Sequence, residues 1–465
     1  MKQLYANHSF ALVIGGSAAG LLSALELAKS FDNVTVIDKH DILSNAPNPF
    51  VPQSDQINAL AHGGIVAMNS INPEILQYIG RMGFEPVDPG AAIRYAEGPS
   101  WSSGVETALE TIYAPRRTFD AGLIAAVLRR PNISFRRGIV TQANIHEASQ
   151  EVEIVTKSGS LGKFKIVIDA RGRHRPSFDI VEDAASGVTT RDDINLYMQT
   201  ALYRQRTVVS DGWKVIVIGE APMKGARGSF VVNFDNTFSV AHGDRMERPA
   251  GPTHESMLQF ARRLPNDTIA RLIEGSDPIS FGTPYRYAKA IYRHFDRTRG
   301  FPPGILVIGD AHISTNPMYG LGISLAAVGA QTLGEVLKSL HGETWSGLAP
   351  TYYRAMKNTT DLAWHITSRV DRWLGPNSPL ARLPRMFELA VASVRDGALR
   401  DDRLAKLVLS NAQLSPFARK VSSAHVVSGA IRGYRRPALE FRPIRTIENL
   451  YDHGGVENHS ALDRM

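Results

Sequence analysis

A turn of small residues near the N-terminus has the spacing of a nucleotide-binding motif. Residues 15–20 read Gly-Gly-Ser-Ala-Ala-Gly, after the apolar, strand-like run Phe10–Ile14 and before a helical pattern. Small residues let a backbone approach a pyrophosphate, a helix N-terminus offers unpaired N–H groups, and an acidic residue about 20 positions further on can bind a ribose. Here Asp38 ends a second apolar run, residues 34–37, and lies 23 positions after Gly15. The pattern predicts a site for an adenine dinucleotide.

The same turn has a second interpretation, as the elbow that carries a hydrolase serine. Ser17 would be the nucleophile, and His62-Gly63-Gly64 resembles an oxyanion-hole loop. In α/β-hydrolases that loop precedes the elbow, and a nucleophile after the first strand leaves no earlier strands to build it. This order disfavours the hydrolase. An ordinary glycine-rich turn in an unrelated α/β protein is a third interpretation.

A second group of small and polar residues follows an apolar run at residues 304–309. Asp310 comes directly after this run, and residues 316–324 read Asn-Pro-Met-Tyr-Gly-Leu-Gly-Ile-Ser before an apolar helical pattern. Asp310 could bind a sugar-like hydroxyl, and Gly320 and Gly322 would expose backbone N–H groups at the helix start. These groups suit a ribityl chain and a ring that becomes anionic.

Together, the two groups resemble those of the FAD-dependent aromatic hydroxylase superfamily, the class A flavoprotein monooxygenases that share the para-hydroxybenzoate hydroxylase fold. The resemblance extends from residue 10 to residue 436 and includes the C-terminal helices. Within the superfamily the chain looks like the bacterial branch that contains the lasalocid and monensin polyene epoxidases. The segments that carry this finer resemblance are residues 13–22, Val51-Pro52-Gln53 with Ala59-Leu60, residues 115–120 and residues 316–322.

The resemblance implies a set of FAD-binding residues. The pyrophosphate would lie against Gly15, Gly16, Ser17, Ala19 and Gly20, and the adenosine against Asp38, Lys39 and Val140. Arg116 would lie beside the phosphates or the ribityl chain. Gly309 would let the ligand pass close, and Asp310 would bind the ribityl chain. The isoalloxazine ring would be flanked by Pro317, Gly320, Leu321, Gly322 and Ile323.

One more segment, from Asp169 through Gly172 to Arg173, resembles the family's Asp-Ala-Thr-Gly-Arg sequence, which closes the FAD domain and is linked to nicotinamide use. Arg171 replaces the usual threonine there. A second departure is at residues 54–58, which read Ser-Asp-Gln-Ile-Asn where the family often has a glycine followed by Arg-His-Val-His. The FAD prediction does not depend on either position.

Four β-rich runs between the two FAD segments predict an antiparallel sheet that roofs the flavin. They cover residues 195–204, 213–219, 229–234 and 237–241. The candidate substrate-pocket residues are Met198, Tyr203, Trp213 and Phe230 from this sheet, and Asn316 and Tyr319 from the second turn. Helical patterns follow at residues 351–374, 381–394 and 403–409.

The expected fold is α/β, with a Rossmann-like FAD-binding domain, a β-sheet substrate domain and C-terminal helices. The FAD-binding domain would comprise residues 1–190 and 301–340, and the antiparallel substrate domain residues 191–300. Residues 341–465 would form a helical region and a tail, and the polar stretch from Pro443 would be loose or reach a second subunit of a homodimer.

Composition limits the function classes. The chain has 465 residues, of which 43% are hydrophobic, and no cysteine, which excludes disulfides, thiolate-ligated metals and a cysteine nucleophile. Its 14 histidines show no metal-binding spacing, so we expect no metal. The net charge of +7 comes from scattered residues, which favours solubility over nucleic-acid binding. The apolar N-terminal run is interrupted by glycines and Glu26, so we expect a cytoplasmic protein without a signal peptide or membrane span.

The resemblance implies an FAD-dependent monooxygenase of secondary metabolism, such as antibiotic biosynthesis. NADH or NADPH would reduce the flavin, directly or through a separate flavin reductase. One oxygen atom of O₂ would then enter an apolar alkene, phenol or heteroaromatic compound by epoxidation or hydroxylation. No catalytic side chain follows from the sequence. The alternatives are an FAD-dependent reductase of a prenyl-type substrate, a non-catalytic FAD-binding protein, and a flavin-dependent halogenase, against which the lack of a Gly-Trp-x-Trp-x-Ile-Pro motif counts.

Overall fold

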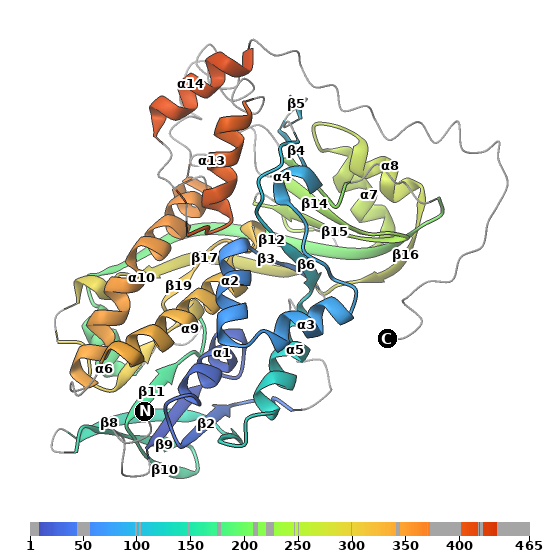
Figure 1. The fold of residues 1–465 in the computed structure, drawn as a ribbon. Coiled ribbons are helices and arrows are strands. Elements are labelled where there is room, and N and C mark those ends of the chain that lie inside the picture. The colour runs from blue at the N-terminus through green and yellow to red at the C-terminus, as the bar shows by residue number, and fades with distance from the viewer. Residues whose placement is uncertain are drawn as a thin grey trace.

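The structure is a computed structural model, and the residues that it describes include both predicted FAD segments (Figure 1). The described residues are 9–43, 56–97, 100–101, 104–146, 149–173, 178–207, 213–219, 227–245, 247–249, 251–298, 300–340, 345–369, 371–372, 401–416, 418 and 422–434. The helix predicted at residues 381–394, the polar tail and Val51-Pro52-Gln53 lie outside the described residues.

A five-stranded parallel sheet contains the first strand of the described chain. Its order is β18-β11-β1-β2-β7, with bounds Ile305–Val307, Ile166–Asp169, Phe10–Ile14, Asn33–Asp38 and Ile133–Arg137. Every adjacent pair of these strands is parallel. Because the carboxyl ends of parallel strands meet at one edge, the residues after β1, β2, β11 and β18 come together there. The predicted α/β fold is confirmed.

Helices cover this sheet because their apolar faces require burial. Helix α1, Ala18–Leu27, is buried along almost its whole length between the sheet and its helical neighbours. Those neighbours are α5, Arg116–Leu128, and α9, Gly322–Ser339, both of which contact α1. Helix α9 also packs against α2, His62–Ile71. The beginning of the chain and residues 305–339 therefore share one core.

A nine-stranded sheet forms the other main layer. Its strands are β4 Ile93–Glu97, β5 Ser100–Trp101, β12 Thr189–Gln205, β13 Val215–Gly219, β14 Arg227–Phe234, β15 Thr237–Asp244, β16 Ser276–Phe281, β17 Tyr285–Arg293 and β19 Ile313–Ser314. All four β-rich runs of the sequence prediction are strands in it. The sheet also takes strands from outside residues 191–300, because β4 pairs in parallel with β13 and brings β5 with it, and β19 pairs with β17.

Two smaller sheets and several short helices complete the described fold. Strands β8 Val140–His146, β9 Glu151–Thr156 and β10 Gly159–Phe164 form a separate antiparallel sheet, and β3 Ile57–Leu60 pairs with β6 Ile112–Pro115. The shorter helices are α3 Glu74–Arg81, α4 Pro89–Ala92, α6 Asp179–Ala185, α7 His254–Arg262 and α8 Thr268–Glu274.

The C-terminal part is helical, as predicted, in the residues that are described. Helix α10, Leu348–Trp364, widens into a π-helical turn at His365–Arg369, and α13 Asp402–Ala412 and α14 Ser423–Tyr434 follow. Helices α13 and α14 stand at the opposite end of the molecule from the parallel sheet (Figure 1). Among the helices that the structure describes, none combines the length and the apolar character needed to cross a membrane.

Candidate functional site

A cavity of about 440 Å³ lies at the carboxyl edge of the parallel sheet. It receives residues from both glycine turns and from the nine-stranded sheet, to which Tyr287 belongs. The predicted FAD-binding residues that line it are Gly15, Ser17, Ala19, Asp38, Lys39, Arg116, Val140, Gly172, Gly309, Asp310, Pro317, Gly320, Gly322 and Ile323. The structure brings these residues, which come from distant parts of the chain, into one cavity.

Four predicted residues lie behind the cavity wall and not in it. Gly20 contacts the turn so closely that a Cβ there would collide with the Gly15 carbonyl oxygen. Gly16 donates its N–H to Asp38. Asp169 is buried at the end of β11, and Leu321 is buried in a separate apolar cluster. These residues shape the wall from behind.

The first turn is held tightly by its own backbone. The Gly15 N–H donates to the Ile37 carbonyl oxygen at 2.8 Å, which joins the turn to β2. Gly15 has φ +111°, and a Cβ there would lie 2.5 Å from the carbonyl oxygen of Ala170, after β11. Only glycine fits this position without strain, because the conformation and the neighbouring backbone both exclude a side chain.

The Asp38 carboxylate also connects β2 to this turn. Its Oδ2 accepts the Gly16 N–H and its Oδ1 accepts the His40 N–H, each at 2.8 Å. Each carboxylate oxygen keeps a second lone pair for another donor. Asp38 therefore fixes the turn and still faces the cavity as an acceptor.

Arg116 holds the hydroxyl of Ser17. Its Nη2 donates to Ser17 Oγ at 2.8 Å, and its Nε pairs with Asp120 Oδ1 at 2.9 Å. A guanidinium group is always charged in proteins and cannot act as a general base. The arrangement disfavours Ser17 as a nucleophile and leaves Arg116 at the N-terminus of α1, where an anion would bind.

Arg171 and Arg173, which follow β11, have different partners. Arg171 Nε and Nη2 pair with the two oxygens of Asp169 at 2.9 and 2.8 Å, and the guanidinium lies 4.5 Å from the Phe178 ring centroid. Arg173 stacks 4.1 Å from the centroid of Tyr287 and lines the cavity with it. Sequence reasoning missed Tyr287 as a wall residue, because nothing local in β17 marks it.

The second turn completes the cavity. Gly309 has φ +62°, and a Cβ there would lie 2.6 Å from Ala19 Cβ, so the end of β18 closely approaches the start of α1. Gly320, with φ +67°, lies against Ala59 of β3. Helix α9 begins at Gly322 on the wall, where its first N–H groups and the positive end of its dipole can act on a ligand.

The predicted substrate-pocket residues of the sheet divide between its two faces. Met198 and Phe230 are on the face that contacts Met318 of the second turn. Tyr203 and Trp213 pack in the cluster under α7 and α8, so the prediction that they face the pocket is wrong. Met198 and Tyr203 are an odd number of residues apart in a regular stretch of β12, and alternation sends their side chains to opposite faces.

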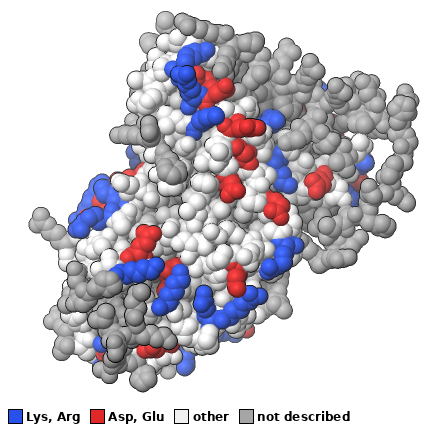
Figure 2. Space-filling view, in the orientation of Figure 1, with Lys and Arg blue, Asp and Glu red and all other residues white. Residues whose placement is uncertain are grey.

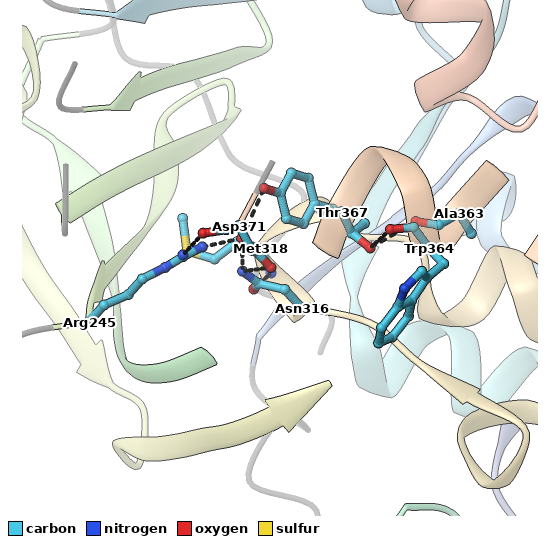
Figure 3. A network of polar contacts seen from close by, with 8 residues as sticks. Arg245, Asn316, Met318, Ala363, Trp364, Thr367 and Asp371 are labelled. Carbon is cyan, nitrogen blue, oxygen red and sulfur yellow. Dashed lines mark hydrogen bonds and ion pairs between the residues drawn. The ribbon is translucent and has the colours of Figure 1, made fainter. Parts of the chain in front are cut away.

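Asn316 and Tyr319 do not line the cavity. Their side chains bind the buried carboxylate of Asp371, beyond the second turn (Figure 3). Asp371 was not singled out from the sequence, and no motif around it could have indicated this contact.

Comparisons with known proteins agree on the fold. No protein-family model matches the chain. Protein Rv3254 of Mycobacterium tuberculosis is 26% identical over 384 residues, which are 76% of this chain and 78% of that protein. The flavin-dependent brominase Bmp2 superposes with a TM-score of 0.62 and 17% identity, over 92% of this chain and 99% of its own. The chain has the fold of this flavin-dependent enzyme. PqsL of Pseudomonas aeruginosa, a probable FAD-dependent monooxygenase, superposes with a TM-score of 0.61 and 14% identity, over 79% of this chain and 97% of its own.

Proposed function

We propose that the chain is an FAD-dependent monooxygenase that inserts one oxygen atom of O₂ into an apolar alkene, phenol or heteroaromatic small molecule. The observation that carries the proposal is the meeting of two glycine turns, from opposite halves of the chain, in one cavity with the start of α9 at its wall. Similarity of fold to a probable FAD-dependent monooxygenase supports it.

The cavity residues fit FAD in their chemistry. The first turn and the start of α1 would hold the pyrophosphate, and Arg116 would supply a positive charge. Asp38, Lys39 and Val140 would surround the adenosine, and Asp310 would accept hydrogen bonds from the ribityl chain. A Cβ on Gly322 would have no atom within 4 Å, which leaves room for a ring beside α9.

FAD, when bound, supplies the redox chemistry and the activation of oxygen. The chain itself would orient the ring and favour negative charge on it through the positive end of α9. The apolar face that contains Met198 and Phe230 would exclude water from the reacting region. Neither role needs a side-chain acid or base.

The proposal is tested by following the origin of the oxygen atom. The purified protein is reduced anaerobically and mixed with ¹⁸O₂ and a panel of apolar alkenes and phenols, and label in the products is read by mass spectrometry. We expect one ¹⁸O atom per product molecule. An unlabelled or saturated product would contradict the monooxygenase and favour a reductase. The Gly15→Val variant, which we expect to lose FAD, is the negative control.

The reductant is a second part of the proposal. We propose NADH or NADPH, used directly or through a separate flavin reductase. Arg171 lines the cavity and pairs with Asp169 through Nε and Nη2, so part of its guanidinium is already engaged within the chain. Anaerobic mixing of the FAD-loaded protein with each nucleotide, with and without an added flavin reductase, separates the routes through the loss of flavin absorbance.

Halogenation is a second candidate because a flavin-dependent brominase has the same fold over 92% of this chain. The ¹⁸O₂ experiment, repeated with bromide or chloride and phenolic substrates, decides between the two. A halogenated product without ¹⁸O would favour the halogenase.

A further inference from the structure

A buried cluster of polar side chains joins the second turn to two segments that are distant from it in sequence (Figure 3). Asp371, in the segment that follows the π-helical turn after α10, accepts hydrogen bonds from Asn316 and Tyr319 of the turn. It also pairs with Arg245, which directly follows β15. We call these four residues the Asp371 cluster.

Asn316 carries the contact into the turn. Its Nδ2 donates to Asp371 Oδ1 at 3.1 Å and Oδ2 at 3.2 Å, while its Oδ1 accepts the Met318 N–H at 3.0 Å. The amide is therefore fixed in one orientation. Tyr319 adds a hydrogen bond from its hydroxyl to Asp371 Oδ1 at 3.1 Å. Asp371 thus holds the turn on both sides of Pro317, which lines the cavity.

The cluster is too buried to be an ordinary surface ion pair. The side chains of Asp371 and Arg245 are 3% and 12% exposed, and Asn316 is 1% exposed. Burial raises the pKa of Asp371, and Arg245, Asn316 and Tyr319 oppose that shift. Breaking a buried pair from one side leaves an uncompensated polar group, so removal of Asp371 should release the turn that it holds.

The turn is also held by packing against its neighbours. It runs from β19 to the start of α9, and its glycine, Gly320, adopts a left-handed conformation against Ala59. Met318 packs on the sheet, where a Cβ on Gly243 would meet its sulfur at 2.5 Å. The three hydrogen bonds from Asn316 and Tyr319 to Asp371 add a polar restraint to this packing.

We infer that Asp371 is a positioning residue that sets the second turn and the start of α9 against the flavin ring, through Asn316 and Tyr319. The inference rests on the proposed function for the identity of the ligand. The restraint on the turn itself does not, because it exists in the chain alone and can be measured without FAD.

The test compares Asp371→Ala, Asn316→Ala, the double variant and the wild type. Arg372→Gln is the matched control, because Arg372 is the next residue and its pair with Asp192 at 2.8 Å is on the surface. Hydrogen–deuterium exchange of residues 316–322 in the apoprotein reports the restraint. Titration of apoprotein with FAD gives the Kd, and the reduction potential of the bound flavin reports how α9 is aligned with the ring.

We expect Asp371→Ala to accelerate exchange in residues 316–322, to raise the Kd for FAD about tenfold and to make the potential more negative. Asn316→Ala should do the same, and the double variant should add little, because both residues act through one contact. Arg372→Gln should match the wild type.

Unchanged exchange in Asp371→Ala would overturn the inference, and so would faster exchange with an unchanged Kd and potential. Additive effects in the double variant would also contradict it. If Asp371→Ala does not fold, Asn316→Ala alone decides by the same criteria, since Asp371 keeps its pair with Arg245. If the wild type does not bind FAD, the proposed function fails, and the exchange result still decides whether Asp371 holds the turn.

Discussion

Gly320 and Gly322 are two residues apart at the start of α9 but differ in what a side chain would meet. Gly320 has φ +67°, and a Cβ there would lie 3.0 Å from Ala59 Cβ, whereas Gly322 has open space. We expect Gly320→Val to destabilise the apoprotein by about 1–2 kcal/mol because of the left-handed backbone. Gly322→Val should leave apoprotein stability near the wild type.

Both variants should weaken FAD binding, Gly320→Val by displacing the turn and Gly322→Val by filling the cavity. Urea denaturation of the apoproteins measures the change in stability, and titration with FAD measures the change in affinity. Normal FAD binding by Gly322→Val would show that the ring does not lie beside α9.

Asp310 follows β18 and lines the cavity. If it accepts hydrogen bonds from the ribityl chain, Asp310→Ala removes charge-assisted bonds worth about 1–3 kcal/mol. We expect the Kd for FAD to rise about tenfold to hundredfold, measured by fluorescence titration of the apoprotein. An unchanged Kd would contradict this assignment.

For Ser17, unlike Asp310, we expect that removal of the side-chain oxygen leaves FAD binding unchanged. Its hydroxyl accepts a hydrogen bond from Arg116, and Arg116 has Asp120 as a second partner. Ser17→Ala should therefore retain FAD and oxygenate substrate at a rate within about threefold of the wild type, since one exposed hydrogen bond is worth little. A variant that binds FAD normally but is inactive would restore a chemical role for the hydroxyl.

At the scale of elements, His242 joins β15 to β14 and α7. Its Nε2 lies 3.0 Å from the Met257 carbonyl oxygen and its Nδ1 lies 2.8 Å from Ser229 Oγ, so the neutral ring donates to the carbonyl and accepts from the serine. Burial lowers the pKa of His242 to about 3. In the unfolded chain this histidine is protonated below about pH 6.5, whereas in the folded chain it stays neutral down to about pH 3. The free energy of unfolding is therefore highest above pH 6.5 and decreases as the pH falls from 6.5 toward 3.

We therefore expect this histidine to remove about 2 kcal/mol from the free energy of unfolding between pH 7 and pH 5. The His242→Gln variant, which can still bond both partners, should lose correspondingly less over that range. Urea denaturation at the two pH values measures the difference. Burial also lowers the pKa of His312 to about 3. This residue would account for part of the pH dependence of the free energy of unfolding that remains in the His242→Gln variant.

Sequence patterns predicted those elements whose signal is local. The turn at residues 15–20 and the apolar runs around it were found because glycine spacing and strand hydrophobicity both depend only on residues that are neighbours in the sequence. Tyr203 was misplaced because alternation along β12 puts it on the face opposite to Met198, and that face is covered by α7 and α8, which are distant in sequence. Asp371 was missed because its partners are 55 and 52 residues away in sequence and no pattern connects them.

For the whole molecule, ligand binding should stabilise both layers together, because the cavity takes residues from each. With FAD at 100 times its Kd, we expect the free energy of unfolding to rise by about 2.7 kcal/mol. Gly15→Val, whose side chain would collide with the Ala170 carbonyl, should show no such gain. Thermal or urea unfolding with and without FAD tests this, and an equal gain in the variant would place the ligand elsewhere.

Both signs of charge are spread over the described part of the face in view, where Lys and Arg side chains lie among Asp and Glu (Figure 2). This agrees with the scattered distribution of the charges in the sequence.

The position of β18 at the edge of the parallel sheet has a consequence for synthesis of the chain. Its neighbour β11 ends at Asp169, but β18 begins only at Ile305. At translation rates of about 5–20 residues per second, β11 waits on the order of ten seconds with one hydrogen-bonding edge unpaired. During that interval the nascent chain has an unpaired strand edge that favours aggregation, and its cavity lacks the residues of the second turn. The yield of folded protein should therefore depend on chaperone supply and on growth temperature more than on the FAD concentration during translation.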